Sequence, residues 1–275
     1  MPLGIGMIIL LAVIQGLTEF FPVSSSGHLV IFESLFGLRG EGSSFGILFE
    51  LAVHVGTLGA VIVCYRERII LLCRAVLSLV VSGRRGYASY RSELDYIGFI
   101  AIGTIPAAVI GAAFHDEITA AFNAPSLTAL CLVATGIYLV TSKGRAATRS
   151  LTRSSALIIG LAQAIAILPG CSRSGWTITT GLLLGLGFAR AAEFSFLLSV
   201  PAVVGAIALE LVKEPVVLTV HSLSPLVIGA VGAFVSGWLA LKLLIGILRG
   251  EAFHRFAYYL VPAGLVAFTY FAVLT

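Results

Sequence analysis

Two short polar segments interrupt the apolar sequence of this chain and hold the residues best suited to chemistry. Residues 15–28 place the carboxylate of Glu19 near a run of serines, and residues 169–177 carry Arg173 among further hydroxyls. A serine becomes a nucleophile when a base takes its proton. A guanidinium presents a planar fork of donors to phosphate oxygens. Together the two segments favour a site for a phosphorylated ligand.

The first segment combines hydroxyls with an acid and a histidine. Ser25 lies in the middle of the serine run, and either Glu19 or His28 could accept its proton. Gln15 and Glu19 are four residues apart, on one face of a helix that leads into the serine turn. A divalent cation, Mg²⁺ or Ca²⁺, held by Glu19 with Gln15 as a neutral oxygen ligand would neutralise phosphate charge. The candidate residues of this segment are Gln15, Glu19, Ser24, Ser25, Ser26 and His28.

The second segment combines a cation with the start of a helix. A helix that begins near Gly175 would aim free N–H groups and the positive end of its dipole at the ligand held by Arg173. Neighbouring hydroxyls add further contacts. The residues expected to bind phosphate are Ser172, Arg173, Ser174, Gly175 and Thr177, with Ser24 and Ser26 from the first segment.

A structural alternative is an ion pair between Glu19 and Arg173 that only joins the two halves of the chain. Charged groups inside a bilayer are costly and by default indicate function. A purely structural pair needs no cluster of hydroxyls, no histidine and no glycines. The neighbouring residues therefore favour a functional site.

The composition indicates the solvent of this chain. Of 275 residues, 59% are hydrophobic and 11% are charged, which places lipid rather than water around most of the surface. The formal charge of +4 is not the footprint of a nucleic-acid binder, because the basic residues form short clusters between apolar runs. The sequence predicts an integral membrane protein with no nucleic-acid partner.

Apolar runs long enough to cross a bilayer predict six transmembrane helices. A crossing needs roughly 20 residues. Shorter apolar segments at 3–14, and at 156–168 with 178–188, lead into the two polar turns and predict re-entrant hairpins. The predicted spans are residues 45–65, 96–114, 125–141, 194–212, 225–248 and 257–274.

The positions of lysine and arginine support this layout. Clusters at 66–91 and 143–153 are separated by two crossings and lie on one face, which is expected to be cytoplasmic. If residues 156–190 enter and leave on that face, Arg190, Lys242, Arg249 and Arg255 join them, and only Arg39 and Lys213 face outward. The acidic turn at 115–117 then falls on the outer face.

Each half of the chain consists of one hairpin followed by three spans, so the halves have opposite orientations. This predicts an inverted repeat, roughly 1–142 and 156–275, within one all-α membrane domain covering residues 1–275. The polar segments also match: QGLTEFFPVSSSG at 15–27 resembles QAIAILPGCSRSG at 163–175, with a one-residue shift at the proline.

Three motifs make the chain similar to a known family. QGLTEFFPVSSSGH at 15–28, PGCSRSGWT at 169–177 and EFSFLLSVP at 193–201 closely resemble the undecaprenyl-diphosphate phosphatase family of the bacitracin-resistance type. The resemblance implies a multi-pass enzyme of the bacterial plasma membrane that recycles the cell-wall carrier lipid. It implies an isoprenoid diphosphate substrate, a divalent cation and an active site that opens to the outer face, and it leaves room for a homodimer.

By position, the resemblance implies roles for individual residues. Ser25 matches the proposed nucleophile, Glu19 the motif glutamate, His28 the motif histidine and Arg173 the phosphate-binding arginine. Gln15 stands where the family has Glu or Gln, which puts in doubt any scheme that needs two carboxylates. Trp176 stands where a small residue is usual and would narrow the pocket.

A transporter or lipid flippase is the competing class of protein. Inverted repeats with broken helices near the midplane are the usual architecture of transporters. Phosphate binding alone explains Arg173 and the glycines, but it does not require a serine beside an acid and a histidine. An enzyme that also carries out a transport step is a third reading.

Overall fold

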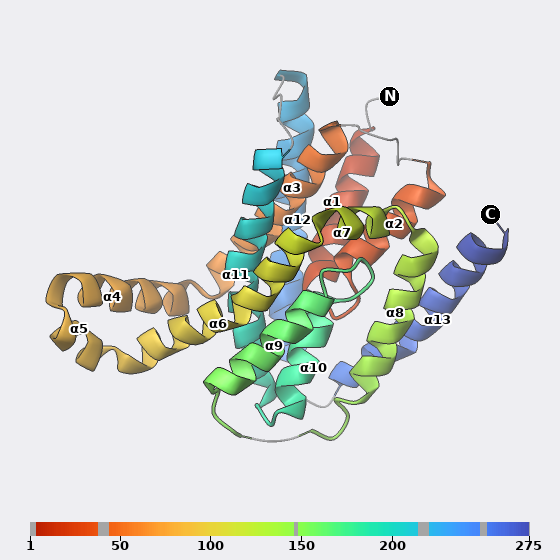
Figure 1. Ribbon diagram of the computed structural model, residues 1–275. Coiled ribbons are helices and arrows are strands. Elements are labelled where there is room, and N and C mark those ends of the chain that lie inside the picture. Colours follow the sequence, from red (N-terminus) through yellow and green to blue (C-terminus); the bar gives the residue numbers. More distant parts are fainter. Residues whose placement is uncertain (1–3, 38–43, 146–147, 214–219, 248–251, 275) are drawn as a thin grey trace.

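The computed structural model describes residues 4–37, 44–145, 148–213, 220–247 and 252–274, and every regular element in this part of the chain is helical (Figure 1). Arg39 and Arg249, two members of the charge pattern, lie outside the described residues. The α-helices are α1 (Ile5–Phe20), α2 (Ser25–Leu35), α3 (Ser44–Cys64), α4 (Arg66–Ser82), α5 (Arg84–Ser89), α6 (Arg91–Ala113), α7 (His115–Phe122), α8 (Pro125–Val140), α9 (Arg153–Ile165), α10 (Arg173–Leu183), α11 (Phe188–Lys213), α12 (Val220–Ile247) and α13 (Ala257–Thr269), with the short 3₁₀-helix η1 (Phe253–Phe256) and the π-helix η2 (Tyr270–Leu274) on either side of α13.

The long apolar helices confirm the prediction of an all-α membrane protein. Four segments of the described chain are long and apolar enough to cross a bilayer: 91–113, 188–212, 223–246 and 253–273. Two further pairs of helices qualify jointly but are bent, α3 with α4 by 82° and α7 with α8 by 96°. Six spans result when each bent pair is counted as one.

The two polar segments form helical hairpins, as predicted. Helices α1 and α9 are apolar but only 16 and 13 residues long, too short to cross the hydrocarbon core. Each is followed by a short break and a second helix that packs against it. In Figure 1 the first hairpin enters from the upper end of the molecule and the second from the lower end, so that their turns meet inside.

Each hairpin is followed by three apolar spans: α3, α6 and the bent pair α7 with α8 in the first half, and α11, α12 and the continuous segment η1–α13–η2 in the second. This order is the one an inverted repeat requires, and the repeat itself stays a prediction. Glycines let several of these helices approach closely. A Cβ atom on Gly56 of α3 would lie 2.2 Å from the carbonyl oxygen of Ala230 in α12, and one on Gly160 of α9 would lie 2.3 Å from that of Gly103 in α6. Such small-residue contacts are the usual means of packing helices in lipid.

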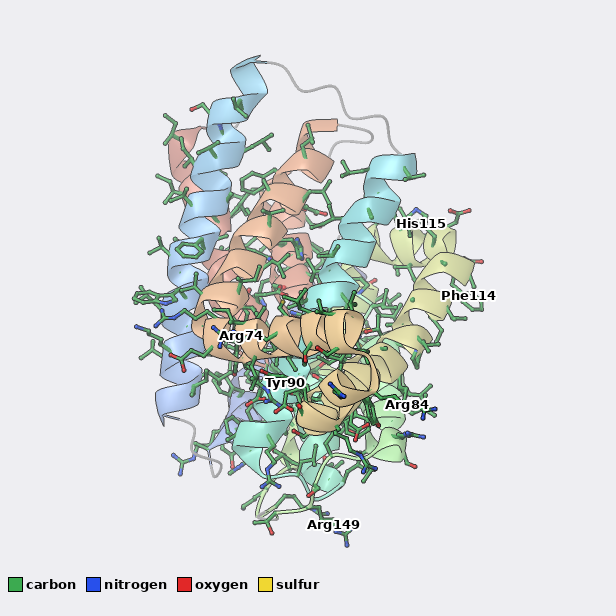
Figure 2. All side chains as sticks on the ribbon, turned by 90° about the vertical axis from the view of Figure 1, so that its left-hand side faces the viewer. Arg74, Arg84, Tyr90, Phe114, His115 and Arg149 are labelled. Carbon is green, nitrogen blue, oxygen red and sulfur yellow. The ribbon has the colours of Figure 1, made fainter. Side chains whose placement is uncertain are left out.

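The basic connection between the first two spans is the largest difference from the sequence prediction. It consists of helices α4 and α5, which together with the start of α6 project sideways from the bundle and are called the arm, residues 66–97 (Figure 1). Figure 2 faces the arm and places Arg74 and Arg84 on it, with Arg149 below and His115 above in that view. Apolar residues between the arginines allow a helix here, a pattern that the charge count alone does not register.

Candidate active site

The turns of the two hairpins are in direct contact. Arg173, at the first position of α10, donates through Nη2 to Oε1 of Glu19, near the end of α1. Ser174 Oγ donates to the carbonyl oxygen of Phe21 at 3.2 Å. The two polar segments therefore face each other, as expected for parts of one site.

Close backbone approach at the turns depends on glycine. A Cβ atom on Gly27 would lie 2.9 Å from Cα of Gly170. Gly170 has φ of +90°, and a Cβ there would lie 2.2 Å from the carbonyl oxygen of Thr128. Only glycine fits both the space and the left-handed backbone at this position.

The Glu19 carboxylate is the hub of the site. Its Oε2 accepts hydrogen bonds from Ser25 Oγ at 2.6 Å and from Gln15 Nε2 at 3.0 Å, and its Oε1 accepts from Arg173. Glu19 and Ser25 are each only 9% exposed. The short hydrogen bond directs the Ser25 O–H at a carboxylate, an arrangement in which the carboxylate can accept the proton and activate the serine.

Local backbone geometry presents Ser25 to Glu19. Ser24 is the N-cap of α2, and its Oγ accepts from the N–H of Gly27 at 3.2 Å. Its φ of +70° makes it the one non-glycine residue with a positive φ in the described part of the chain. Left-handed backbone at such a residue costs free energy and is found where a turn must aim a side chain. Here it sets Ser25 at the start of α2, and Ser26 lies beside the cap with its Oγ 3.3 Å from that of Ser24.

His28 lies one helical turn beyond Ser24 and is held at both ring nitrogens. Its Nδ1 is 2.7 Å from the carbonyl oxygen of Ser24, and its Nε2 is 2.7 Å from the hydroxyl of Tyr259 in α13. Because a carbonyl can only accept, Nδ1 carries the proton, and in the neutral ring Nε2 accepts from the Tyr259 O–H. The two rings also stack, with centroids 5.8 Å apart.

Tyr259 was not identified from the sequence. It belongs to an apolar run in which tyrosine is usual as an interfacial anchor. No spacing signal connects it to a motif 231 residues earlier in the chain. Two further contacts were not predicted as site residues: Thr135 of α8, and Ser195 of α11, which lies within the EFSFLLSVP motif.

Arg173 retains a free donor. Its Nη1 is buried and has no hydrogen-bond partner, whereas Nη2 is bound to Glu19. The cap of α10 lies beside it: Ser172 Oγ accepts from the N–H of Gly175 at 3.1 Å and is 3.2 Å from Ser174 Oγ. A free guanidinium N–H next to a helix N-terminus is a suitable receptor for a phosphate oxygen.

The remaining predicted hydroxyl, that of Thr177, is used within the protein. Its Oγ1 donates to the carbonyl oxygen of Arg173 at 2.7 Å and is 2.6 Å from Ser195 Oγ of α11. Trp176 stacks on Tyr138 of α8 and donates to Thr135 Oγ1 at 3.2 Å. These contacts hold α10, and with it Arg173, against the surrounding helices.

The fold and site describe a polytopic membrane protein in which a serine, a carboxylate and an arginine are in contact between two helical hairpins. The family model for bacitracin resistance protein BacA matches residues 8–266, and the chain belongs to this family. It is 40% identical to an undecaprenyl-diphosphatase of Thermodesulfovibrio yellowstonii over 91% of both chains. It is 38% identical to an undecaprenyl-diphosphatase of Korarchaeum cryptofilum over 95% of this chain and 97% of the relative.

Proposed function

We propose that this chain is a membrane phosphatase that hydrolyses undecaprenyl diphosphate to undecaprenyl phosphate and phosphate. The observation that carries the proposal is the contact set of Ser25, Glu19 and Arg173, which joins a nucleophile, its base and a phosphate-binding cation in one buried site. The curated relatives are named undecaprenyl-diphosphatases. The product would return to the pool of cell-wall carrier lipid.

The first chemical step forms a phosphoserine. Ser25 Oγ attacks the terminal phosphorus while its proton passes to Glu19 Oε2, 2.6 Å away. The bond between the terminal phosphorus and the bridging oxygen breaks, and the lipid monophosphate leaves with that oxygen. Arg173 Nη1, which is free, and the N–H groups of the α10 turn bind the phosphate oxygens. Positioning and charge neutralisation account for most catalysis in phosphoryl transfer.

The second step hydrolyses the phosphoserine. A water attacks phosphorus, and the P–O bond to Ser25 breaks with return of a proton to its oxygen. His28 is the group next to Ser25 that can take the proton of this water, once Nε2 exchanges its bond with Tyr259. Tyr259 is then a positioning residue, because it holds the imidazole in a fixed orientation between turnovers.

A divalent cation, Mg²⁺ or Ca²⁺, fits the donor set of this site. Gln15 Oε1 is buried without a hydrogen-bond partner, and it lies on the same helix face as the Glu19 carboxylate. The described residues contain no cluster of three or more His, Cys, Asp or Glu side chains, so phosphate oxygens and waters would complete the shell, as Mg²⁺ commonly requires. Bound there, the cation would neutralise charge on the diphosphate.

The lipid determines how the substrate reaches the site. The isoprenoid tail stays in the bilayer between helices while the diphosphate enters the polar site. The arginine and lysine clusters predict a cytoplasmic face on one side, and we assign access to the opposite, outer face of the plasma membrane.

Phosphate release from farnesyl or undecaprenyl diphosphate by purified protein tests the proposal. Ser25→Ala should lower turnover at least about 10³-fold, because no intermediate can form. Ser34→Ala is the matched control, since Ser34 lies on the same helix and only donates to the carbonyl oxygen of Val30. Normal turnover by Ser25→Ala would transfer the role to Ser24, Ser26 or a water activated by His28. No release with any divalent cation would favour a transporter.

A further inference from the structure

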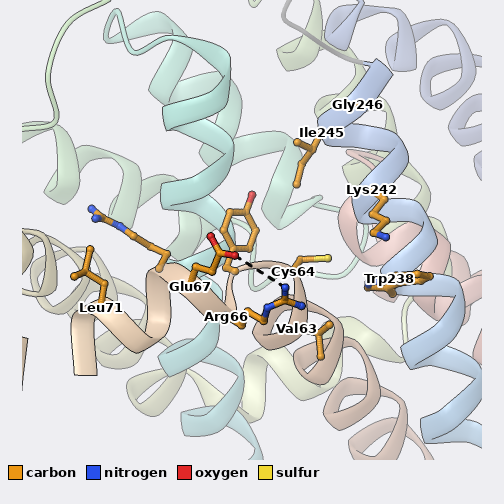
Figure 3. Close-up of a pocket in the computed structure, with 11 residues that line it drawn as sticks. Val63, Cys64, Arg66, Glu67, Leu71, Trp238, Lys242, Ile245 and Gly246 are labelled. Carbon is orange, nitrogen blue, oxygen red and sulfur yellow. Dashed lines mark ion pairs between the residues drawn. The ribbon is translucent and has the colours of Figure 1, made fainter. Parts of the chain in front are cut away.

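A cavity with charged and apolar lining residues lies at the elbow between α3 and α4, facing α12 (Figure 3). Its volume is about 770 Å³. Neither the Ser25 nor the Arg173 hairpin lines it, so it is separate from the site described above. This elbow pocket is lined by Val63, Cys64, Tyr65, Arg66, Glu67, Arg68, Leu71, Trp238, Lys242, Ile245 and Gly246.

Positive charge faces the elbow pocket from both walls. Arg66 stands at the start of α4, and Lys242 on α12 lies with its Nζ 3.8 Å from the centroid of the Trp238 ring. Glu67, the acidic residue of the lining, is 4.0 Å from Arg66, and both side chains are largely exposed. The solvated pair leaves Arg66 available to a further anion.

The third basic residue, Arg68, also lines the pocket, but its guanidinium is engaged by residues of other helices. Its Nε lies 3.2 Å from Glu193 of α11, and its guanidinium covers the ring of Tyr96 at 4.6 Å. The contacts of Arg68 also hold α4 against the bundle, so side-chain contacts fix the geometry of the elbow.

Backbone dipoles add to the positive field of the elbow pocket. The 17-residue helix α4 starts at Arg66, and its N-cap, Tyr65, makes no side-chain capping bond. The first N–H groups of a helix without such a cap are free to bind an anion. The pocket thus combines a helix N-terminus with two cationic side chains.

The arm indicates that the elbow pocket lies at the level of lipid head groups. Helix α4 runs at 82° to α3. It exposes apolar side chains, with Leu77 62% and Val80 76% accessible, beside the arginine Arg74. A helix with exposed apolar and basic residues that runs across a spanning helix is typical of the membrane interface. With the arm at the interface, Arg66 and Lys242 would be at the level of the head groups.

We propose that the elbow pocket binds the phosphate head group of a membrane lipid, with the phosphate between Arg66 and Lys242. This goes beyond the phosphatase activity and does not depend on it. A phospholipid such as phosphatidylglycerol and an isoprenyl monophosphate present the same chemistry, a phosphate at the end of an apolar chain. Trp238, in contact with Lys242, packs beside that chain.

Fluorescence of Trp238 provides a direct test. The chain contains two tryptophans, so Trp176→Phe leaves Trp238 as the single reporter. The protein is placed in phosphatidylcholine nanodiscs that contain a small fraction of either brominated phosphatidylglycerol or brominated phosphatidylcholine. With two cations at the interface, the apparent affinity for the anionic lipid should exceed that for the neutral one about tenfold. Quenching by the two lipids is compared as a ratio, because Lys242 itself affects Trp238.

Matched variants distinguish binding in the elbow pocket from a general attraction of anionic lipid to surface charge. Arg66→Gln and Lys242→Gln should each remove most of the preference, whereas Arg74→Gln, on α4 but outside the pocket lining, should keep it. Equal quenching by both lipids, or equal loss in Arg74→Gln, would overturn the proposal. Relief of quenching by inorganic phosphate would also overturn it, in favour of a free-phosphate site. If farnesyl phosphate relieves the quenching of Trp238, the proposal is supported and the ligand is an isoprenyl monophosphate. If the quenching persists in the presence of farnesyl phosphate, the ligand is the phospholipid.

Discussion

The two hairpins carry the same helix cap and different chemistry. In each turn the N-cap serine accepts from the N–H three residues later, at 3.2 Å for Ser24 and 3.1 Å for Ser172. In each, that serine also meets the hydroxyl two residues on, at 3.3 Å and 3.2 Å. Ser25 and Arg173 therefore occupy equivalent positions, the first residue of α2 and of α10.

The difference between the hairpins lies in a few side chains. At the equivalent position one hairpin presents Ser25, the proposed nucleophile, and the other presents the cation Arg173. Gln15 and Gln163 match in the sequence alignment, but Gln15 donates to Glu19, whereas Gln163 has Ile167 four residues on and both of its amide atoms are buried without partners. Two copies of one scaffold thus supply complementary halves of a site, because each needs only one charged residue of its own.

The largest effect is expected from removing the cation of the second hairpin. Arg173→Ala should lower kcat/KM for farnesyl diphosphate about 10³-fold, the scale of an arginine that stabilises transferred phosphoryl charge. Ser172→Ala should cost less, since it removes one cap hydroxyl. Arg190→Ala is the matched control, because Arg190 only donates to backbone carbonyls of residues 148 and 149. Similar losses in Arg173→Ala and Arg190→Ala would show that the two hairpins are joined only structurally.

A smaller effect should follow from the contact that only the first hairpin has. Tyr259→Phe removes the partner of His28 Nε2 and should lower kcat about tenfold, the worth of one hydrogen bond. KM should stay unchanged if Tyr259 only positions His28, because the phosphate is held by the other hairpin. A matched change at an exposed tyrosine of the same helix, Tyr258→Phe, should be silent. A rise in KM with constant kcat would instead place Tyr259 against the substrate.

The proposed divalent-cation site involves Gln15 of the first hairpin and not Gln163, its counterpart in the second. Gln15→Leu removes the free amide oxygen and should raise the Mg²⁺ or Ca²⁺ concentration for half-maximal activity about fivefold, since one neutral ligand of several is lost. Gln163→Leu should leave that concentration unchanged. Phosphate release is measured against metal concentration after treatment with a chelator. Identical metal curves for Gln15→Leu and the parent protein would contradict the assignment.

Substitution of Gln163 is expected to leave activity unchanged and to alter only the stability of the protein. Its amide is 3% exposed and unpaired, so Gln163→Leu removes a buried unsatisfied group and should stabilise the protein by about 1 kcal/mol. Thermal unfolding in detergent measures the change, and phosphate release should be unaltered. A loss of activity without a loss of stability would mean that the amide contacts the substrate.

Much of the site could be predicted because the relevant signals are local. Gln15 and Glu19 share a helix face by spacing alone, and the serine, glycine and proline residues of the turns predict the helix breaks. Thr177 shows where local reasoning stops: its residue type suits phosphate, but its hydroxyl contacts Ser195 of another helix. The arm was missed because its arginines dominate the charge pattern and mask the apolar face between them.

Composition and periodicity were enough to establish lipid as the solvent, the positions of the spanning helices and the two hairpins that cannot span. These properties depend on burial and on backbone hydrogen bonding within one segment, which neighbouring residues decide. The pairing of Glu19 with Arg173, 154 residues away, and of His28 with Tyr259, 231 residues away, depends on how helices pack. So does the elbow pocket between α4 and α12. Contacts between distant helices depend on side-chain shape at every interface, and only the folded chain brings those shapes together.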